Sequence, residues 1–407
     1  MAMKKKSFNY LLRMNSIHLG TNYLWISYES YILPMELLTY NSSSLFLGLI
    51  AFMGTAIGVF VGLLIGTVSD RYNFGWGRRG PYIVVAAIAT SISVFINREL
   101  SISLAGILIG YIIIQTASNT AVGAYQPIYV DILEKDERGE GTGIGGIFRL
   151  IGSAMGYGIT GFLIDTEYSK YILILMAIAL MITGLLTAGT IRKSDHIIAQ
   201  KKEGAMKLFM DMFNLKSGMH DYIYVLIGSF LVFSAVIGLS FFELYFFKYI
   251  MHFANPAYYV SIAGIVVLAT SAFASFVVGT LSDKIGRTGI LIVVSLLGGI
   301  AMVLIPEFEK FYYFLILGSI IGISYGVFMS VSNALASDMS PLKESGKFMG
   351  YYNMATGGAS SISPLMYGLI LYLSHSYATG FRLVFYTAGI FFFAGFILFL
   401  KVHHDKL

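Results

Sequence analysis

Long apolar segments dominate this sequence and constrain what it can fold into. Twelve segments, most of them about 20 residues long, are apolar enough to cross a bilayer as an α-helix. Only 12% of the 407 residues are charged and 57% are hydrophobic, whereas a soluble domain normally carries about 25% charged residues. The sequence therefore predicts an all-α membrane protein with twelve transmembrane helices. The expected spans are Tyr10–Leu33, Leu45–Val68, Tyr82–Ile96, Ile102–Tyr129, Gly143–Ile164, Tyr171–Ile191, Tyr222–Phe247, Tyr258–Val278, Ile290–Ile305, Phe311–Ala336, Phe348–Leu373 and Phe381–Leu400.

Basic residues are distributed unevenly between the two sides of the expected membrane. If the N-terminus is cytoplasmic, most of the 27 lysine and arginine residues fall in cytoplasmic segments. This is the positive-inside distribution. We therefore expect a multi-pass protein of the cell membrane with both termini in the cytoplasm. The apolar stretch after the basic N-terminus runs on to Leu33 with no small-residue cleavage site, so it predicts a retained helix rather than a signal peptide.

The sequence contains an internal repeat. Three residues of the first half recur about 210 residues later at nearly the same offset. The pairs are Gly66 and Gly279, Asp70 and Asp283, and Asp131 and Asp338. The longest polar connection divides the chain into two pseudo-symmetric six-helix halves, an arrangement found in transporters. We expect an N-terminal bundle over residues 1–191, a cytoplasmic linker over 192–220 and a C-terminal bundle over 221–407.

The loop after the second expected span carries a family resemblance. Gly66–Arg71 followed by Gly77–Arg79 resembles the signature loop of the major facilitator superfamily, and Gly279–Arg287 resembles it more weakly. With its continuation Gly80–Tyr82, the loop is similar to that of the glycoside–pentoside–hexuronide symporters, especially the sucrose-transporter-like branch. The resemblance covers nearly the whole chain. It implies the major facilitator fold and a sugar or glycoside as the solute.

The charged residues of these loops are suited to a cytoplasmic gate. Cations at helix ends can pair with Asp131, Glu134 or helix dipoles in one gate state and separate in the other. The alternative is that the arginines only anchor the topology. The predicted gate residues are Gly66, Asp70, Arg71, Gly77, Arg78, Arg79, Asp131, Gly279, Asp283, Arg287 and Asp338.

Polar side chains inside the expected spans are the candidate solute-binding residues, because their burial in a bilayer is costly. Glu29, with aromatic neighbours, suits a sugar, although it is alternatively a proton carrier or a solvated rim residue. Arg149 is expected to bind an anionic or hydroxyl-rich solute, to pair with a carboxylate, or to reach the cytoplasmic surface along its stem. Asn333 and Asn353 are expected either at the solute or in helix–helix hydrogen bonds. The candidate solute-binding residues are Asn22, Tyr23, Trp25, Glu29, Gln115, Asn119, Arg149, Asn333 and Asn353.

The proton-carrying candidates are Glu29, His18 and Glu243, with packing as the alternative for His18 and outer-rim solvation for Glu243. In plant-type sucrose transporters, which this chain resembles, the fourth span carries an acid and a base. Gln115 and Gln126 stand at those positions here, and glutamine has no titratable proton. Coupling, if present, must therefore use another group.

Together these features predict a secondary active transporter that works by alternating access. We expect a symporter that takes up a sugar or glycoside with a cation, the solute binding between the two halves. The alternatives are an exporter of amphiphilic compounds, a passive uniporter and, from another class, a non-transporting membrane receptor or sensor. The expected partners of this monomer are a carbohydrate and the lipid bilayer.

Enzymatic activity is not expected, because the sequence holds no catalytic motif, no phosphate-binding loop and no cysteine. We expect no cofactor, no metal and no nucleic-acid partner. The only bound ion that we expect is a coupling proton or sodium ion.

Overall fold

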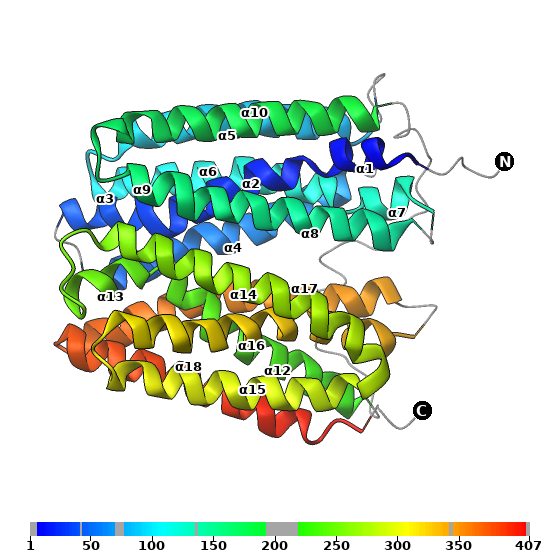
Figure 1. The fold of residues 1–407 in the computed structure, drawn as a ribbon. Helices are drawn as coiled ribbons and strands as arrows, with labels where there is room; N and C mark the ends of the chain where they lie inside the picture. The colour runs from blue at the N-terminus through cyan, green and yellow to red at the C-terminus, as the bar shows by residue number, and fades with distance from the viewer. Residues whose placement is uncertain are drawn as a thin grey trace. The chain divides into compact units, whose positions relative to one another are not determined.

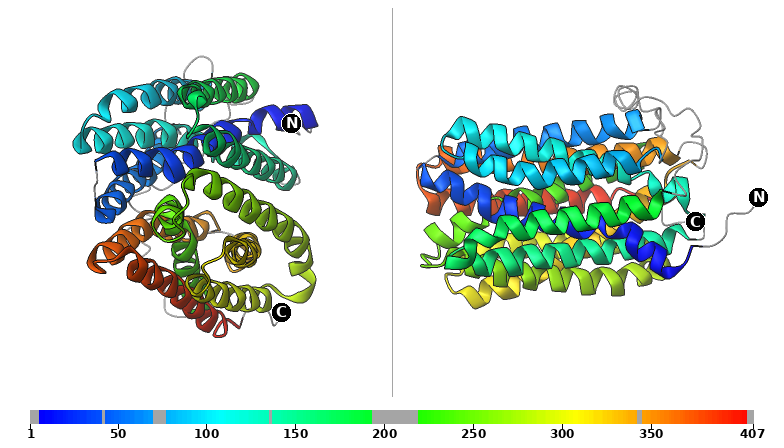
Figure 2. Two further views of the ribbon diagram at one scale, coloured as in Figure 1. Left: turned by 60° about the vertical axis from the view of Figure 1, so that its left-hand side comes forward. Right: turned by 90° about the horizontal axis from the view of Figure 1, so that it is seen from above.

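The computed structural model describes residues 6–40, 43–69, 77–134, 137–192, 219–341 and 345–403. Within these residues every regular element is a helix, and none is a strand. Contacts divide the chain into two compact units, Met1–Asn41 with Met53–Ala205, and Ser42–Phe52 with Met206–Leu407. Within each unit the helices lie side by side with roughly parallel or antiparallel axes (Figures 1 and 2). The predicted all-helical class is confirmed for the described residues.

The first unit contains most of the elements from α1 to α10, and the first residues of α4 group with the second unit. These elements are α1 (Phe8–Asn15), α2 (Ile17–Ser27), the π-helix η1 (Tyr28–Ile32), α3 (Leu33–Thr39), α4 (Ser44–Ser69), α5 (Gly80–Leu100), α6 (Leu104–Tyr125), α7 (Ile128–Ile132), α8 (Arg138–Met155), the π-helix η2 (Gly156–Thr160), α9 (Gly161–Leu163), the 3-10 helix η3 (Glu167–Tyr171) and α10 (Ile172–Ile191).

The second unit contains the remaining helices. They are α12 (His220–Ser240), α13 (Glu243–Tyr249), α14 (Pro256–Ile285), α15 (Arg287–Leu304), the 3-10 helix η4 (Ile305–Glu307), α16 (Phe311–Asp338), α17 (Ser345–Leu373) and α18 (Tyr377–Phe399).

Nine helical segments of the described residues are long and apolar enough to cross a membrane. They coincide with nine of the twelve expected spans. The other three expected spans fall on α1–α3, α8–α9 and α17. The first of these is divided by η1 and the second by η2, while α17 contains Pro364. The predicted number of twelve spans is therefore not confirmed, although helices occupy all twelve expected positions.

Two π-helical turns in the first unit pack against each other. The hydroxyl groups of Ser27, next to η1, and Thr160, at the end of η2, lie 2.6 Å apart. The ring of Tyr31 meets that of Tyr157 edge-on at 6.3 Å. A π-helical turn changes the direction of the side chains that follow it and is frequent at functional sites. The turn η1 contains Glu29, so this irregularity sets the direction of an ionisable side chain.

Glycine allows close approach between helices of the first unit. A Cβ atom at Gly152 of α8 would overlap the backbone carbonyl oxygen of Leu19 on α2. In the same way, Gly123 of α6 lies against the backbone of Gly62 on α4. Small residues at such crossings permit backbone contact within membranes. The crossing of α2 and α8 therefore depends on the absence of a side chain at one position.

We expect Gly152→Ala to destabilise the protein by about 1–3 kcal/mol, because one added methyl group forces two helix backbones apart. Gly146→Ala on the same helix is the matched control, since nothing lies within 4 Å of a Cβ built there. Thermal unfolding of the purified protein should show a lower midpoint for the first variant alone. Equal midpoints would contradict the proposed crossing.

Candidate functional site

The carboxylate of Glu29 is hydrogen-bonded inside the first unit. Its Oε1 accepts from the Tyr111 hydroxyl at 3.1 Å and from the Gln115 side-chain amide at 3.0 Å. The same amide nitrogen lies 2.7 Å from the Tyr111 hydroxyl oxygen. Tyr111 and Gln115 are only 1% and 3% exposed. The structure therefore places the carboxylate of the half-buried Glu29 against a buried polar surface, and the alternative of a solvated rim residue stays a prediction.

Local helix geometry brings these groups together. On α6, Tyr111 and Gln115 are four residues apart and so share one face. From η1, the ring of Tyr28 stacks on that of Tyr111 with centroids 5.3 Å apart and planes at 5°. Sequence analysis missed Tyr111, although its position one turn before Gln115 was the available signal.

Asn119 extends this face of α6 by one further turn. Its side-chain nitrogen donates to Gln115 Oε1 at 2.8 Å and to the Gln115 carbonyl at 3.0 Å. A Cβ atom at Gly58 of α4 would lie 2.5 Å from that nitrogen. Glycine at this position therefore leaves room for the two amide side chains.

The chain of groups from Glu29 to Asn119 combines a carboxylate, a phenol and two amides. Such groups offer both donors and acceptors to the hydroxyl groups of a solute, and the carboxylate can also hold a proton. No group of three or more histidine, aspartate or glutamate side chains in the described residues could hold a metal ion. The chain of groups from Glu29 to Asn119 is suited to hydrogen bonding and proton binding.

A second polar cluster surrounds Asn15. Its Oδ1 accepts from the hydroxyls of Tyr125 at 2.8 Å and Tyr129 at 2.5 Å. The Nε2 atom of His18 lies 3.1 Å from the Tyr129 hydroxyl. Arg149 is within electrostatic reach of His18 and both tyrosines. The two predicted residues His18 and Arg149 thus lie together.

Arg149 has no carboxylate partner among the described residues. Its Nε atom is buried without a hydrogen bond, and it takes part in none of the ion pairs found there. The predicted pairing with a carboxylate is therefore not seen in the described part of the chain. The interpretation of Arg149 as a group that contacts the solute stays a prediction.

The other predicted residues of the first span lie apart from the Glu29 network. The side-chain nitrogen of Asn22 donates to the His18 carbonyl of its own helix at 2.9 Å. Tyr23 is fully buried, and the indole nitrogen of Trp25 is buried without a hydrogen-bond partner. None of these three side chains hydrogen-bonds with Glu29 in the described part of the chain.

In the second unit, Asn333 on α16 and Asn353 on α17 are both exposed. Neither side chain forms a hydrogen bond with another described helix. Glu243 differs, because its Oε2 atom is buried without a hydrogen-bond partner. The residue as a whole is half-buried, so its proton-carrying role and its solvated-rim alternative both stay predictions.

A charged cluster joins helix ends of the first unit. Asp131 on α7 accepts from Arg78 and from Arg79, each at 2.7 Å. Arg79 also donates to the hydroxyl of Ser69 at 2.8 Å, and its side chain is fully buried. The predicted gate cations therefore contact the predicted gate carboxylate, and Ser69 is an additional partner.

The corresponding pair in the second unit joins Arg287 to Asp338. This pair is more exposed than that of Asp131, with the Asp338 side chain 50% exposed.

Among the predicted gate glycines, Gly77 adopts a φ of 125° that favours glycine. The others pack near another helix, Gly66 against α6 and Gly279 near Ser330. Asp70, Arg71 and the side chain of Asp283 lie outside the described residues.

A carboxylate that sequence analysis missed lies on α3. Glu36 accepts from Asn97 at 3.0 Å and from Ser101 at 2.7 Å. The Tyr28 hydroxyl donates to it at 3.4 Å. Because Tyr28 stacks on Tyr111, the tyrosine pair connects the surroundings of Glu36 and Glu29. The sequence gives no periodic signal for this contact, since Glu36 follows the expected end of the first span.

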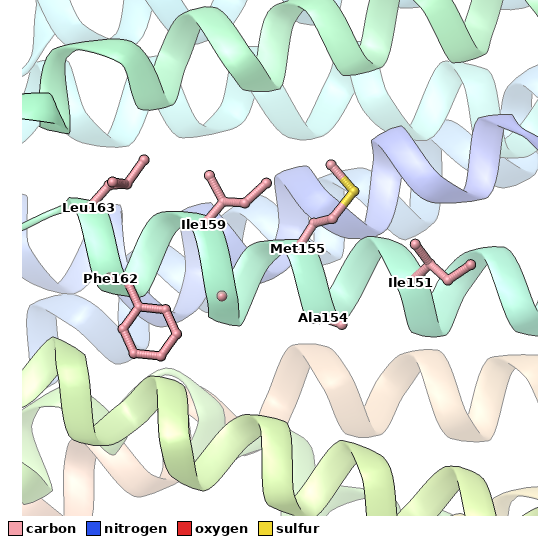
Figure 3. Close-up of a pocket in the computed structure, with 7 residues that line it drawn as sticks. Ile151, Ala154, Met155, Ile159, Phe162 and Leu163 are labelled. Atoms are coloured by element: carbon pink, nitrogen blue, oxygen red, sulfur yellow. The ribbon is translucent and has the colours of Figure 1, made fainter.

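A separate apolar hollow lies along α8, η2 and α9 (Figure 3). Its lining includes Ile151, Ala154, Met155, Ile159, Phe162 and Leu163. None of its lining side chains is charged, so it offers apolar contacts rather than hydrogen bonds.

Comparisons with known proteins agree with this architecture. The model of the Major Facilitator Superfamily matches residues 17–270 and 252–406. The chain is similar to the sucrose transport protein SUC4 of Arabidopsis thaliana, with 30% identity over 38% of this chain and 33% of that protein. It is also similar to the human proton-associated sugar transporter A, with 25% identity over 50% of this chain and 30% of that protein. The matches thus cover about a third of the length of these relatives.

Solved structures show the same fold. A bacterial homologue of the human lysosomal transporter Spinster superposes with a TM-score of 0.79 at 14% identity, covering 99% of this chain and 98% of that one. The nucleoside transporter NupG superposes with a TM-score of 0.74 at 17% identity, covering 98% and 100%. The family match and the shared fold point to a transporter rather than an enzyme, and the chain belongs to the Major Facilitator Superfamily.

Proposed function

We propose that this protein is a secondary transporter that takes up a sugar or glycoside together with protons. The observation that carries the proposal is the Glu29 carboxylate, hydrogen-bonded to Tyr111 and Gln115 within a membrane-spanning bundle. Ionisable residues in such positions are costly and mark solute or proton pathways. We also infer twelve spans in two six-helix halves with cytoplasmic termini, supported by the distribution of basic residues.

The chemistry of the site supports a hydroxyl-rich solute. A carboxylate, a phenol and two amides follow one another from Glu29 through Tyr111 and Gln115 to Asn119. Each can exchange its present hydrogen bonds for bonds to sugar hydroxyls. The curated relatives include a sucrose transport protein and a proton-associated sugar transporter, which favours the same class.

Proton coupling is supported by the neighbour of Glu29 on the fourth span. In the sucrose-transporter-like branch that the sequence resembles, an acid stands where this chain has Gln115. Here the Gln115 amide donates to the carboxylate of Glu29, 3.0 Å away. We infer that the first span supplies the acid that the fourth span lacks. Transport would then remain coupled to protons, with the proton-binding carboxylate on the first span instead of the fourth.

We expect Glu29→Gln to reduce the stimulation of uptake by an inward proton gradient. Glutamine keeps the size and hydrogen-bonding capacity of the side chain but has no titratable proton. The measurement is uptake of radiolabelled sucrose and other disaccharides into proteoliposomes, with and without the gradient. Sugar exchange at equal concentrations should persist, because it needs no net proton movement.

Glu99→Gln is the matched control, since Glu99 is an exposed residue of the same unit. It should retain full stimulation. Undiminished stimulation in Glu29→Gln would exclude Glu29 as a carrier. Disaccharide uptake by the wild type without any response to the gradient would indicate a passive uniporter.

An exporter of amphiphilic compounds is a second candidate, favoured by the apolar hollow on α8–α9. A relative named multidrug resistance protein MdtG, from Yersinia enterocolitica, is 35% identical over 31% of this chain and 30% of that protein. Absence of uptake for every disaccharide would favour this candidate over the sugar transporter.

The charged cluster at Asp131 is proposed to act as a cytoplasmic gate. We expect Asp131→Asn to destabilise the protein by about 3–5 kcal/mol, because the buried Arg78 loses the counter-charge of its ion pair and Arg79 loses its bond to the same carboxylate. Asp338→Asn, in the more exposed pair with Arg287, should cost less than about 1 kcal/mol. Thermal unfolding measures both variants, and uptake per folded molecule should fall further in Asp131→Asn. Equal effects in the two variants would contradict a special role for Asp131.

A further inference from the structure

The carboxyl group of Glu243 falls in the seventh expected span, three residues after the end of α12, and hydrogen-bonds with none of the described residues. The helix α12 ends at Ser240, the chain turns at Phe241 and Phe242, and α13 begins at Glu243. The Oε2 atom is buried and accepts no hydrogen bond from the described residues. The residues beside Glu243 in the chain, Phe242 and Leu244, are 0% and 1% exposed. An acidic group therefore lies next to apolar side chains that give it no donor.

Glu243 occupies the position in the second half that corresponds to Glu29 in the first. Tyr28–Tyr31 reads aromatic, glutamate, any residue, tyrosine, and Phe242–Tyr245 reads the same. The two segments are about 210 residues apart, like the other members of the internal repeat. Sequence analysis identified both glutamates but not this relation between them.

Both glutamates lie at an interruption of their helix. Glu29 is part of the π-helical turn η1, and Glu243 follows the break between α12 and α13. Regular helices place side chains at fixed angles, so an interruption redirects the side chain that it carries. The same acid at the same kind of irregularity in both halves points to one role performed twice.

The surroundings of Glu243 disfavour an ionised carboxylate. No ion pair of the described residues includes it, and Lys248 instead lies over the ring of Tyr249. An uncompensated charge of this kind is strongly destabilising. The group must therefore bind a cation when it is enclosed.

The neighbouring elements supply no counter-charge. On α13 itself the titratable groups are Tyr245, Tyr249 and Lys248. The packed helices α14 and α18 add Tyr258, Tyr259, Lys284, Tyr377, Arg382 and Tyr386. The helix α16, whose rings contact α13, adds Tyr312, Tyr313, Tyr325 and Asp338, while the side chain of Asp283 is outside the described set. None of the described groups forms a hydrogen bond or ion pair with Glu243, and Arg382 lies 3.9 Å from Glu307 instead.

A proton is the cation that this site can hold. Metal cations need several oxygen ligands, and no group of three or more histidine, aspartate or glutamate side chains that could hold a metal ion includes Glu243 among the described residues. A proton needs only the carboxylate as its ligand. One O–H bond forms when the proton arrives from one side of the membrane, and the same bond breaks when the proton leaves to the other side. The burial of Oε2 thus fits a proton and not sodium.

We propose that Glu243 is a second proton-binding site, equivalent by the internal repeat to Glu29. Each transport cycle then carries two protons, one on the acid of each half. The number of protons per cycle depends on the proposed function, whereas proton binding at Glu243 does not.

Infrared spectroscopy of the purified full-length protein in lipid tests the site without any solute. The difference between wild type and Glu243→Gln at pH 7 should contain the C=O band of one protonated carboxyl group. That band should disappear at alkaline pH and should shift, not vanish, in Glu243→Asp. Glu309→Gln is the matched control, because Glu309 is exposed, and it should remove no such band. If Glu243→Gln removes no protonated band at pH 7, or if sodium rather than pH alters the band, the proposal is overturned.

A second measurement tests whether the site takes part in coupling. Proton flux and radiolabelled sucrose flux are recorded together in proteoliposomes, and the ratio of protons to sugar should fall by half in Glu243→Gln. An unchanged ratio overturns the carrier role. If the wild type transports no sugar, the proposed function fails, while the infrared band still decides whether Glu243 binds a proton.

Discussion

A polar group within a membrane has no bulk water to bind, so its hydrogen bonds must come from the protein. The structure around Glu29 follows from this requirement. The carboxylate needs donors, and the facing helix α6 supplies Tyr111 and Gln115 on one side. The turn η1 directs the carboxylate toward them, and Gly58 leaves room for the amide of Asn119. A change at any of these positions would leave a buried polar atom without its partner.

Under the proposed coupling, the same requirement allows the proton-binding acid to stand on the first span instead of the fourth. The resemblance to sucrose-transporter-like proteins places an acid on the fourth span, where this chain has Gln115. The structure puts the Glu29 carboxylate in hydrogen-bonding contact with that glutamine. What matters for proton binding is where the carboxylate lies and which donors surround it. The helix that carries the carboxylate is a secondary matter.

Helix irregularities accompany the two buried acids. The turn η1 is supported by η2 through the contact of Ser27 with Thr160, so the interruption of one helix is matched by that of its neighbour. Around Glu243 the helix is interrupted completely between α12 and α13. Side-chain periodicity predicts neither feature, because an irregular turn depends on what the neighbouring helix offers.

Much of the candidate site was predictable, and the missing part has a physical cause. Glu29, Gln115 and Asn119 stand out because polar residues are rare within apolar segments. Tyr111 and Glu36 do not stand out, since aromatic residues are common in membrane helices and Glu36 follows the apolar run. Asn333 and Asn353 were equally prominent in the sequence, yet both are exposed on their helices. Polarity within a span marks a candidate, but it does not reveal which neighbour the side chain faces.

The sequence by itself determined the helical class, the positions of the helices and the internal repeat, because each of these depends on local apolar length and on residue spacing. Only the tertiary structure decided that Glu29 meets Tyr111 and Gln115, that Asp131 binds two arginines, and that the Oε2 atom of Glu243 is buried without a hydrogen-bond partner among the described residues. These contacts join residues far apart in the chain. They depend on how helices cross and on where glycine or a π-helical turn lets them approach, and no local pattern in the sequence carries that information.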